Sequence, residues 1–170
     1  RLVSPRHETS AAHMAGAYAR LTGKLGVCIA SNGPGVANIL PGVAVENGEG
    51  NRVMLITSCR RPQIAYPDRG GAYQYFDQAG VTRAMCKWSG AVSSFDRLPE
   101  FFRRAARASW RGRPGVVHID VPETIMNGVF DDAGVDVRQP FTYRRTELIE
   151  APSSQVSRAA QLLRDAKRPL

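Results

Sequence analysis

The chain has 170 residues, of which 43% are hydrophobic and 22% are charged, and these proportions are typical of a globular protein rather than a disordered or fibrous one. No apolar run reaches the roughly 18 residues of a membrane-spanning helix, so we expect no membrane partner. The net charge of +8 favours anionic partners such as phosphorylated cofactors. Because the basic residues are not interleaved with aromatic ones and no nucleic-acid-binding motif occurs, we expect no nucleic-acid partner.

The first part of the chain alternates between helical and strand patterns. Residues 8–22 carry apolar or small residues at a 3.6-residue period, which predicts a helix that ends at Gly23. The segments "GVCIAS" (26–31) and "RVMLITSC" (52–59) are short and mostly apolar, as expected of strands that are buried on both faces. Between them, "NGPGVANILPGVAVEN" (32–47) predicts a tight glycine turn that opens a helix of small residues.

The alternation continues after an irregular stretch at 60–80. Residues 84–92 predict a third strand, 96–111 a basic amphipathic helix, and 115–122 a fourth strand. Strands and helices in this order are typical of βαβ crossovers. We therefore predict an α/β fold, with a three-layer parallel sheet that has helices on both faces.

The last part of the chain loses this alternation. Residues 128–150 are rich in polar residues and turn formers and are interpreted as a linker, whereas 151–170 form another amphipathic helix. We therefore expect one domain over 1–127 and the start of a second domain at 151–170. Because no strand follows that helix and the first residue is not Met, we expect the chain to be truncated at both ends.

Few residues point to chemistry when they are considered singly. The glycine turn "SNGPGVAN" (31–38) allows a ligand to approach the backbone closely at a helix N-terminus, but it is neither a dinucleotide fingerprint nor a P-loop. His118 lies in an apolar strand and is interpreted as a core histidine. No histidine or cysteine has metal-ligand spacing, so we predict no metal site and reduced thiols, as in the cytoplasm. The residues concerned are His7, His13, His118, Cys28, Cys59 and Cys86.

Four blocks that occur in one order over residues 1–127 are more specific: "RHETSAAHMAGAYARLTGKLGVCIASNGPGVAN", "AYQYFDQ", "CKWS" and "GRPGVVHIDVP". Together they resemble the pyrimidine-binding domain of thiamine-diphosphate-dependent enzymes. The resemblance is closest to the acetolactate synthase group and its relatives, benzaldehyde lyase and the 2-hydroxyacyl-CoA lyases. It implies part of an enzyme that makes or breaks C–C bonds next to a carbonyl, with thiamine diphosphate as cofactor.

The resemblance leaves three functions open. The first is decarboxylation and carboligation of 2-keto acids, as in acetolactate synthase. The second is cleavage of 2-hydroxy carbonyl compounds, as in the lyases. The third, from another class, is a non-catalytic scaffold or regulatory fragment, and an intact Glu8 argues against it.

The same resemblance implies roles for individual residues. In this family the glutamate of the "RHE" block, here Glu8, hydrogen-bonds N1′ of the cofactor's aminopyrimidine and is the catalytic residue. Gly33, Pro34 and Gly35 match the turn that lies along the pyrimidine ring, and Asn38 matches an asparagine in the helix behind it.

Four further positions match with less specific motifs. Tyr73 and Gln74 match a Phe-Gln pair that borders the substrate pocket, and Lys87 matches a common lysine assigned to the same pocket. Arg113 matches the arginine that contacts FAD in the flavin-containing synthases. Because "GRPG" is also frequent in members without flavin, FAD is not the cofactor that we expect.

The resemblance also implies what the chain does not supply. In this family a C-terminal domain holds the diphosphate and Mg²⁺ through a motif that this sequence lacks. The active site forms between two subunits, in a homodimer or homotetramer, and the substrate is a small 2-keto acid or 2-hydroxy carbonyl compound. We therefore expect a cytoplasmic enzyme of which this chain alone is inactive.

Overall fold

The computed structural model describes residues 2–65, 74–139 and 150–168. At its centre lies a sheet of four parallel strands in the order β1-β2-β4-β3, so β1 and β3 are the edge strands of the described chain. The strands are β1 (Gly26–Ala30), β2 (Val53–Cys59), β3 (Trp88–Ala91) and β4 (Val117–Pro122).

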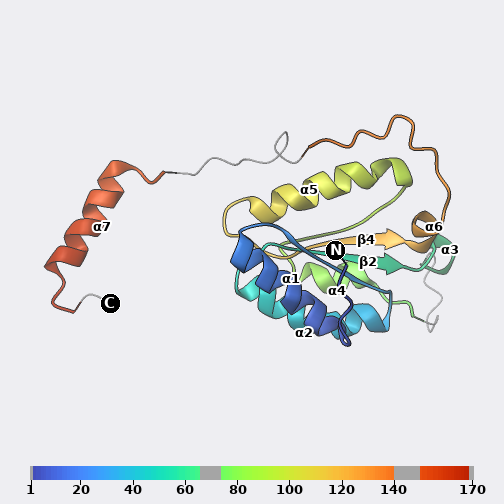
Figure 1. Ribbon diagram of the computed structural model, residues 1–170, viewed down its shortest axis with the longest axis horizontal. Helices are drawn as coiled ribbons and strands as arrows, with labels where there is room; N and C mark the ends of the chain where they lie inside the picture. The colour runs from blue at the N-terminus through green and yellow to red at the C-terminus, as the bar shows by residue number, and fades with distance from the viewer. Residues whose placement is uncertain (1, 66–73, 140–149, 169–170) are drawn as a thin grey trace.

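Helices cover both faces of this sheet, which confirms the predicted three-layer α/β fold (Figure 1). One face is covered by α1, α2 and α4, and the other by α5. The helices are α1 (Glu8–Thr22), α2 (Pro34–Gly48), α3 (Pro62–Ala65), α4 (Gln78–Arg83), η1 (Phe95–Arg97), α5 (Leu98–Trp110), α6 (Glu123–Met126) and α7 (Ser153–Asp165).

Two apolar clusters join these layers. Ile39 and Val43 of α2 pack with the strands on one face, and Ala105 of α5 packs with Ile119 of β4 on the other. All six residues of β4 are buried, as expected of a strand between two helical layers. This burial explains why the strands have almost continuous apolar sequences.

The segment before β3 differs from the prediction in two ways. Residues 78–83 form α4 instead of irregular chain, because the Asp77 side chain accepts a hydrogen bond from the Gly80 amide at 2.8 Å and caps the helix. The third strand begins at Trp88, later than predicted. Met85 and Cys86 are apolar because they pack against the core, but their amides bond back to the carbonyl of Thr82 in a turn.

The C-terminal part of the described chain is mostly exposed. Every residue of α7 is exposed, and residues 140–149, within the predicted linker, lie outside the described residues. The boundaries of the linker and of the second domain therefore stay predictions. Among the described residues, no helix combines the length and the apolar character that a membrane crossing requires.

Close contact between α1 and α2 depends on Gly42. A Cβ at this position would lie 2.7 Å from the Ala12 Cβ and 2.8 Å from the backbone oxygen of Thr9. Both distances are too short for real atoms, so the two helices could not pack at their present separation with a larger residue there.

We expect Gly42→Ala to reduce the free energy of unfolding by about 1–3 kcal/mol, because the added methyl group forces α1 away from α2. Gly48→Ala is the matched control, since Gly48 lies in the same helix and a Cβ there meets no atom within 4 Å. Urea denaturation of the two variants and the wild type measures the difference. Equal midpoints for Gly42→Ala and the wild type would contradict this account of the helix contact.

Candidate functional site

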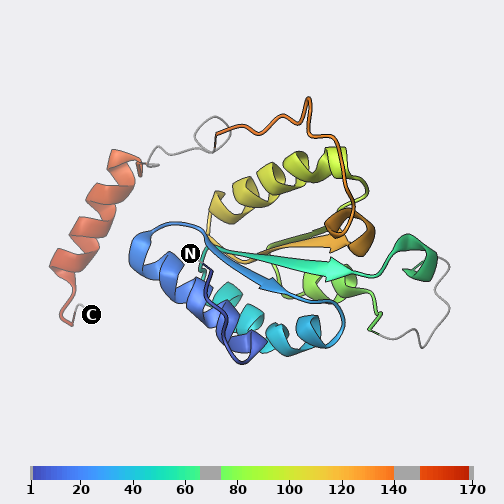
Figure 2. The same cartoon turned by 45° about the vertical axis from the view of Figure 1, so that its right-hand side comes forward.

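All four strands end at the same edge of the sheet, which is where ligands bind in parallel α/β folds. Figure 2 shows the arrows of β2 and β4 pointing towards α3 and α6. The glycine turn follows β1 at this edge, and Asp120 stands near the end of β4. The candidate site is therefore built from segments that the topology gathers at the carboxyl edge.

Glu8 is the first residue of α1, and its side chain is half-buried. Its Oε2 accepts a hydrogen bond from Asn38 Nδ2 at 3.3 Å, and the Thr9 hydroxyl donates to the carbonyl oxygen of Asn38 at 2.5 Å. Two bonds thus tie the start of α1 to α2. Within the described residues, Glu8 Oε1 makes no hydrogen bond, so one carboxylate oxygen is available to a ligand.

The glycine turn has a backbone that only glycine adopts readily. Gly33 is the N-cap of α2, with φ of 63°, and Pro34 occupies the first helical turn. A Cβ on Gly33 would lie 2.7 Å from the Cα of Gln74. A Cβ on Gly35 would lie 2.6 Å from the Ser31 hydroxyl. Glycine is therefore required at position 33 by close packing and by its positive φ, whereas at position 35 a Cβ would have to displace the Ser31 hydroxyl.

Gln74 packs directly on this turn. Its backbone has φ of 58°, which is uncommon for a residue with a side chain, and its carbonyl accepts a hydrogen bond from Asn32 Nδ2 at 3.2 Å. The structure therefore brings Gln74 to the glycine turn. Tyr73, the other member of the predicted pair, lies outside the described residues.

A network of buried polar side chains underlies the turn. The Gly33 amide donates to Gln78 Oε1 at 2.8 Å, and Gln78 Nε2 donates to Asp120 Oδ1 at 2.9 Å. The Thr57 hydroxyl also donates to Asp120 Oδ1, at 2.5 Å, and lies 2.7 Å from His118 Nε2. Because the single hydroxyl proton of Thr57 goes to Asp120, the proton between Thr57 and His118 belongs to Nε2.

Sequence reasoning identified His118 as a core histidine but missed this network. The signal was present, since His118 and Asp120 alternate on one face of a strand that is otherwise apolar, and Thr57 pairs with Asp120 in the neighbouring strand. What the sequence did not indicate was Gln78, which enters the network only because α4 begins there.

Burial shifts the pKa of both ionisable groups in the network. Loss of hydration lowers the pKa of His118 from 6.5 to about 4, so the imidazole is neutral near pH 7. Loss of hydration also raises the pKa of Asp120 from 3.8 to about 6, although hydrogen bonds from Thr57, Cys59 and Gln78 act in the opposite direction. Asp120 is therefore a buried carboxylate that all of these neighbours stabilise in its ionised form.

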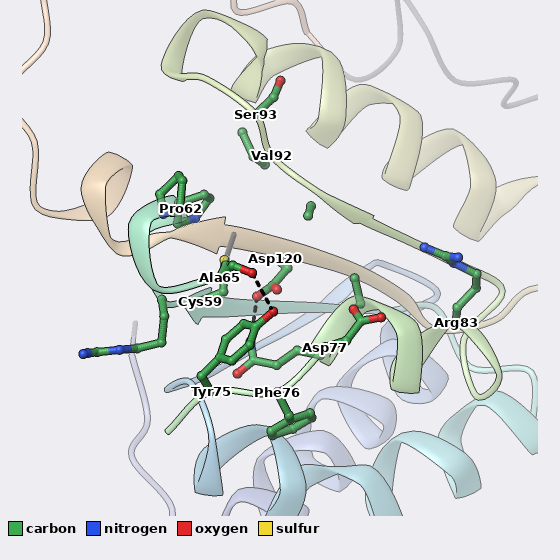
Figure 3. Close-up of a pocket in the computed structure, with 15 residues that line it drawn as sticks. Cys59, Pro62, Ala65, Tyr75, Phe76, Asp77, Arg83, Val92, Ser93 and Asp120 are labelled. Carbon is green, nitrogen blue, oxygen red and sulfur yellow. Dashed lines mark hydrogen bonds between the residues drawn. The ribbon is translucent and has the colours of Figure 1, made fainter. Parts of the chain in front are cut away.

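A cavity of about 640 Å³ adjoins the network at the carboxyl edge. In Figure 3, Tyr75 and Asp77 lie on one side of this cavity and Val92 and Ser93 on the other, with Asp120 and Cys59 between them. Burial raises the pKa of the Cys59 thiol far above its usual range, so this cysteine is not a nucleophile at neutral pH.

Lys87 and Arg113 are not brought to this site. Lys87 precedes β3, and its ammonium donates to the carbonyl oxygens of Arg111 and Arg113. The Arg113 guanidinium donates to the carbonyl oxygens of Asn47 and Gly48 at the end of α2. Both side chains lie at the amino edge of the sheet, opposite Gly33, where they satisfy carbonyl groups. The predicted pocket role of Lys87 and flavin contact of Arg113 therefore gain no support from the contacts within this chain.

The chain is similar to a known protein family and to several known proteins. Residues 1–81 match the family model described as "Thiamine pyrophosphate enzyme, N-terminal TPP binding domain". The chain is 38% identical over 168 residues to an acetolactate synthase from Arthrospira platensis and 37% identical over 166 residues to the isozyme 2 large subunit from Escherichia coli K12. It is also 32% identical over 170 residues to a probable acetolactate synthase large subunit from Methanococcus aeolicus.

By this match, residues 1–81 belong to the N-terminal TPP binding domain of the thiamine pyrophosphate enzyme family. Each of these three alignments covers 97% of the chain but only 27% or 28% of the relative. The chain thus spans little more than a quarter of the length of the curated relatives that it matches.

The residues present fit the cofactor of thiamine pyrophosphate enzymes, which is thiamine diphosphate. An aminopyrimidine needs a carboxyl group at one ring nitrogen, and Glu8 Oε1 is free of partners among the described residues while Asn38 holds Oε2. It also needs a backbone without projecting side chains, which Gly33 and Gly35 provide. Both features lie within the residues that match the family's TPP binding domain.

We expect the buried pair of this family member to have opposing effects on stability as pH changes. Because the pKa of His118 is lowered, the imidazole binds a proton between pH 6.5 and about 4 in the unfolded state but not in the folded state. Stability therefore falls as pH drops from 6.5 towards 4. The raised pKa of Asp120 means that the folded state keeps a proton which the unfolded state releases. Its contribution is therefore full below pH 3.8 and is lost as pH rises through about 6.

Asp120→Asn should therefore make stability rise more steeply with pH between 4 and 6 than in the wild type. His118→Gln should have the opposite effect, so that stability falls with rising pH. Each change in slope is at most about 1.4 kcal/mol per pH unit, the value for one proton. Urea unfolding at several pH values measures the slopes, and three parallel curves would contradict the assignment.

Proposed function

We propose that this chain is the pyrimidine-binding part of an acetolactate synthase-like enzyme. The reaction proposed is loss of CO₂ from a 2-keto acid, followed by joining of the remaining carbons to a second carbonyl compound. The observation that carries the proposal is the half-buried carboxylate of Glu8, held by Asn38 of α2, the helix that the glycine turn opens. The acetolactate synthases among the relatives support the choice of substrate class.

Glu8 has the geometry for a proton relay. With Oε2 fixed by Asn38, Oε1 would share a proton with N1′ of the aminopyrimidine, and the hydrogen bond of Asn38 keeps the carboxylate in one orientation. The pyrimidine ring of the bound cofactor would cover the Glu8 carboxylate, which is only half-buried in this chain. When bound, thiamine diphosphate supplies an electron sink for reactions next to a carbonyl carbon.

The turn would support the ring from below. Gly33, Pro34 and Gly35 present backbone without long side chains, so a flat ring can lie against them. Gln74, which packs on Gly33, remains the proposed substrate-side residue, together with Tyr73. Lys87 is not included, because its ammonium is engaged at the opposite edge.

The remaining parts of the active site would come from elsewhere. We propose that a second subunit and a C-terminal domain supply the site for the diphosphate and Mg²⁺, since no group of three or more His, Cys, Asp or Glu suited to a metal occurs in the described residues. The enzyme is proposed to be a cytoplasmic homo-oligomer, in keeping with the three free cysteines. FAD is not part of the proposal, because Arg113 is engaged in capping α2.

We expect Glu8→Gln in the complete protein to lower the rate of acetolactate formation from pyruvate by about 10²- to 10⁴-fold, the usual contribution of a positioned acid–base group. The carboxamide keeps an oxygen that accepts from Asn38, so the fold should be unchanged. The rate of hydrogen exchange at C2 of the bound cofactor, followed by NMR after acid quenching, should fall with it.

Glu49→Gln is the matched control. Glu49 is also a helix-terminal glutamate, but it pairs with Arg20 at the opposite end of α2 from Asn38. This variant should retain wild-type rates. Unchanged exchange at C2 in Glu8→Gln would refute the role proposed for the carboxylate.

The isolated 170-residue chain should neither turn over pyruvate nor bind thiamine diphosphate tightly. The physical reason is that the proposed site for the diphosphate and Mg²⁺ lies outside it, and most of the cofactor's charge would be left in water. Calorimetric titration of the chain with thiamine diphosphate and Mg²⁺ measures the affinity. Micromolar binding, or measurable acetolactate production, would contradict the division of the site between two domains.

A further inference from the structure

Gln78 connects the glycine turn to the sheet. Its side chain is only 3% exposed and makes three hydrogen bonds. Oε1 accepts from the Gly33 amide at 2.8 Å, and Nε2 donates to the Ser58 carbonyl and to Asp120 Oδ1, each at 2.9 Å. A buried carboxamide with this set of partners has almost all of its hydrogen-bonding capacity in use.

The partners determine which way the carboxamide faces. The Ser58 carbonyl and the ionised Asp120 accept hydrogen bonds, so only the NH₂ group can face them. Oε1 must then face Gly33, whose amide is a donor. Thr57 fixes Asp120 in turn, through a 2.5 Å bond to the same carboxylate oxygen. The orientation of the amide is thereby set by the sheet and not by the turn.

The turn relies on this acceptor. Gly33 has an unusual backbone conformation and, as the N-cap of α2, has no side chain of its own that could cap the helix. Without Gln78 Oε1, its buried amide would have no partner, and an unpaired buried donor is costly. Since Gln74 packs on Gly33, a shift of Gly33 would also move Gln74. Among the described residues, no hydrogen bond joins Gln78 to Glu8 or Asn38, so its effect on the site passes through the turn.

We propose that Gln78 is a positioning residue of the cofactor site, which fixes the Gly33 turn, and with it Gln74, relative to the carboxyl edge of the sheet. The inference rests on the proposed function, because it takes the turn to be the surface on which the aminopyrimidine lies. It adds a residue from a different element, α4, to the residues that the family resemblance implied.

The test compares Gln78→Met with the wild type in the complete protein. Methionine has nearly the same length and volume but neither accepts from Gly33 nor donates to Asp120. Without cofactor, amide hydrogen exchange read by mass spectrometry should increase about tenfold or more in peptides covering 31–35 and 74–78, and little elsewhere. The Kd for thiamine diphosphate with Mg²⁺ should rise by about tenfold to a hundredfold, as loss of one buried hydrogen bond predicts.

Ser89→Ala is the matched control for a merely structural role. The Ser89 hydroxyl belongs to the same network, 3.0 Å from His118 Nδ1, and also bonds to Thr82 and Ala79 of α4. Among the described residues it makes no hydrogen bond to Gln78 or Gly33. The Ser89→Ala variant should have a lower melting temperature. Its amide hydrogen exchange at residues 31–35 and its Kd for thiamine diphosphate should equal those of the wild type. A change in Kd as large as that of Gln78→Met would overturn the proposal, because it would show that any loss of stability loosens the site.

Two further outcomes are decisive. If Gln78→Met does not fold, Gln78→Asn replaces it, since a side chain shorter by one methylene keeps the amide but cannot span from Gly33 to Asp120. Wild-type exchange and wild-type Kd in a folded variant would overturn the inference. Increased exchange at 31–35, together with a wild-type protein that binds no thiamine diphosphate, would instead contradict the proposed function and support the positioning of the turn by Gln78.

Discussion

The arrangement of the site depends on one buried carboxylate. Asp120 is 4% exposed near the end of the most buried strand, and an ionised group in such a place must be surrounded by donors. Thr57 and Cys59 of β2 and Gln78 of α4 supply them. Because Gln78 has to present its NH₂ group to Asp120, its oxygen is left for Gly33. The need of Asp120 for hydrogen-bond donors thus determines which group faces the Gly33 turn, where the ligand is proposed to lie.

The two edges of the sheet have different tasks. At the carboxyl edge, polar groups are arranged around the glycine turn, and Glu8 is brought there by the packing of α1 on α2. At the amino edge, Lys87 and Arg113 donate hydrogen bonds to backbone carbonyl groups. These two side chains are therefore separated from the candidate site by the length of the strands.

Much of this could be predicted from the sequence. Periodicity and glycine positions were sufficient for α1, α2 and the order of strands and helices. The "RHE" and "SNGPGVAN" blocks pointed to Glu8, Gly33 and Asn38, whose roles stay predictions although the structure does join Glu8 to Asn38. Contacts between distant segments were not predictable, because sequence gives no distance between Gln78 and Gly33. The position of Lys87 was unpredictable for the same reason. Its motif indicated a pocket residue, and this role stays a prediction, since within this chain the ammonium bonds to carbonyl groups at the other edge of the sheet.

The capping role of Arg113 bears on how related sequences should be interpreted. The guanidinium closes the end of α2 through its bonds to Asn47 and Gly48, and this task has nothing to do with a cofactor. Capping therefore gives the arginine a structural role in this chain that requires no flavin. A genome survey that sorted related chains into flavoproteins by "GRPG" alone would have to allow for this second reason to keep the arginine.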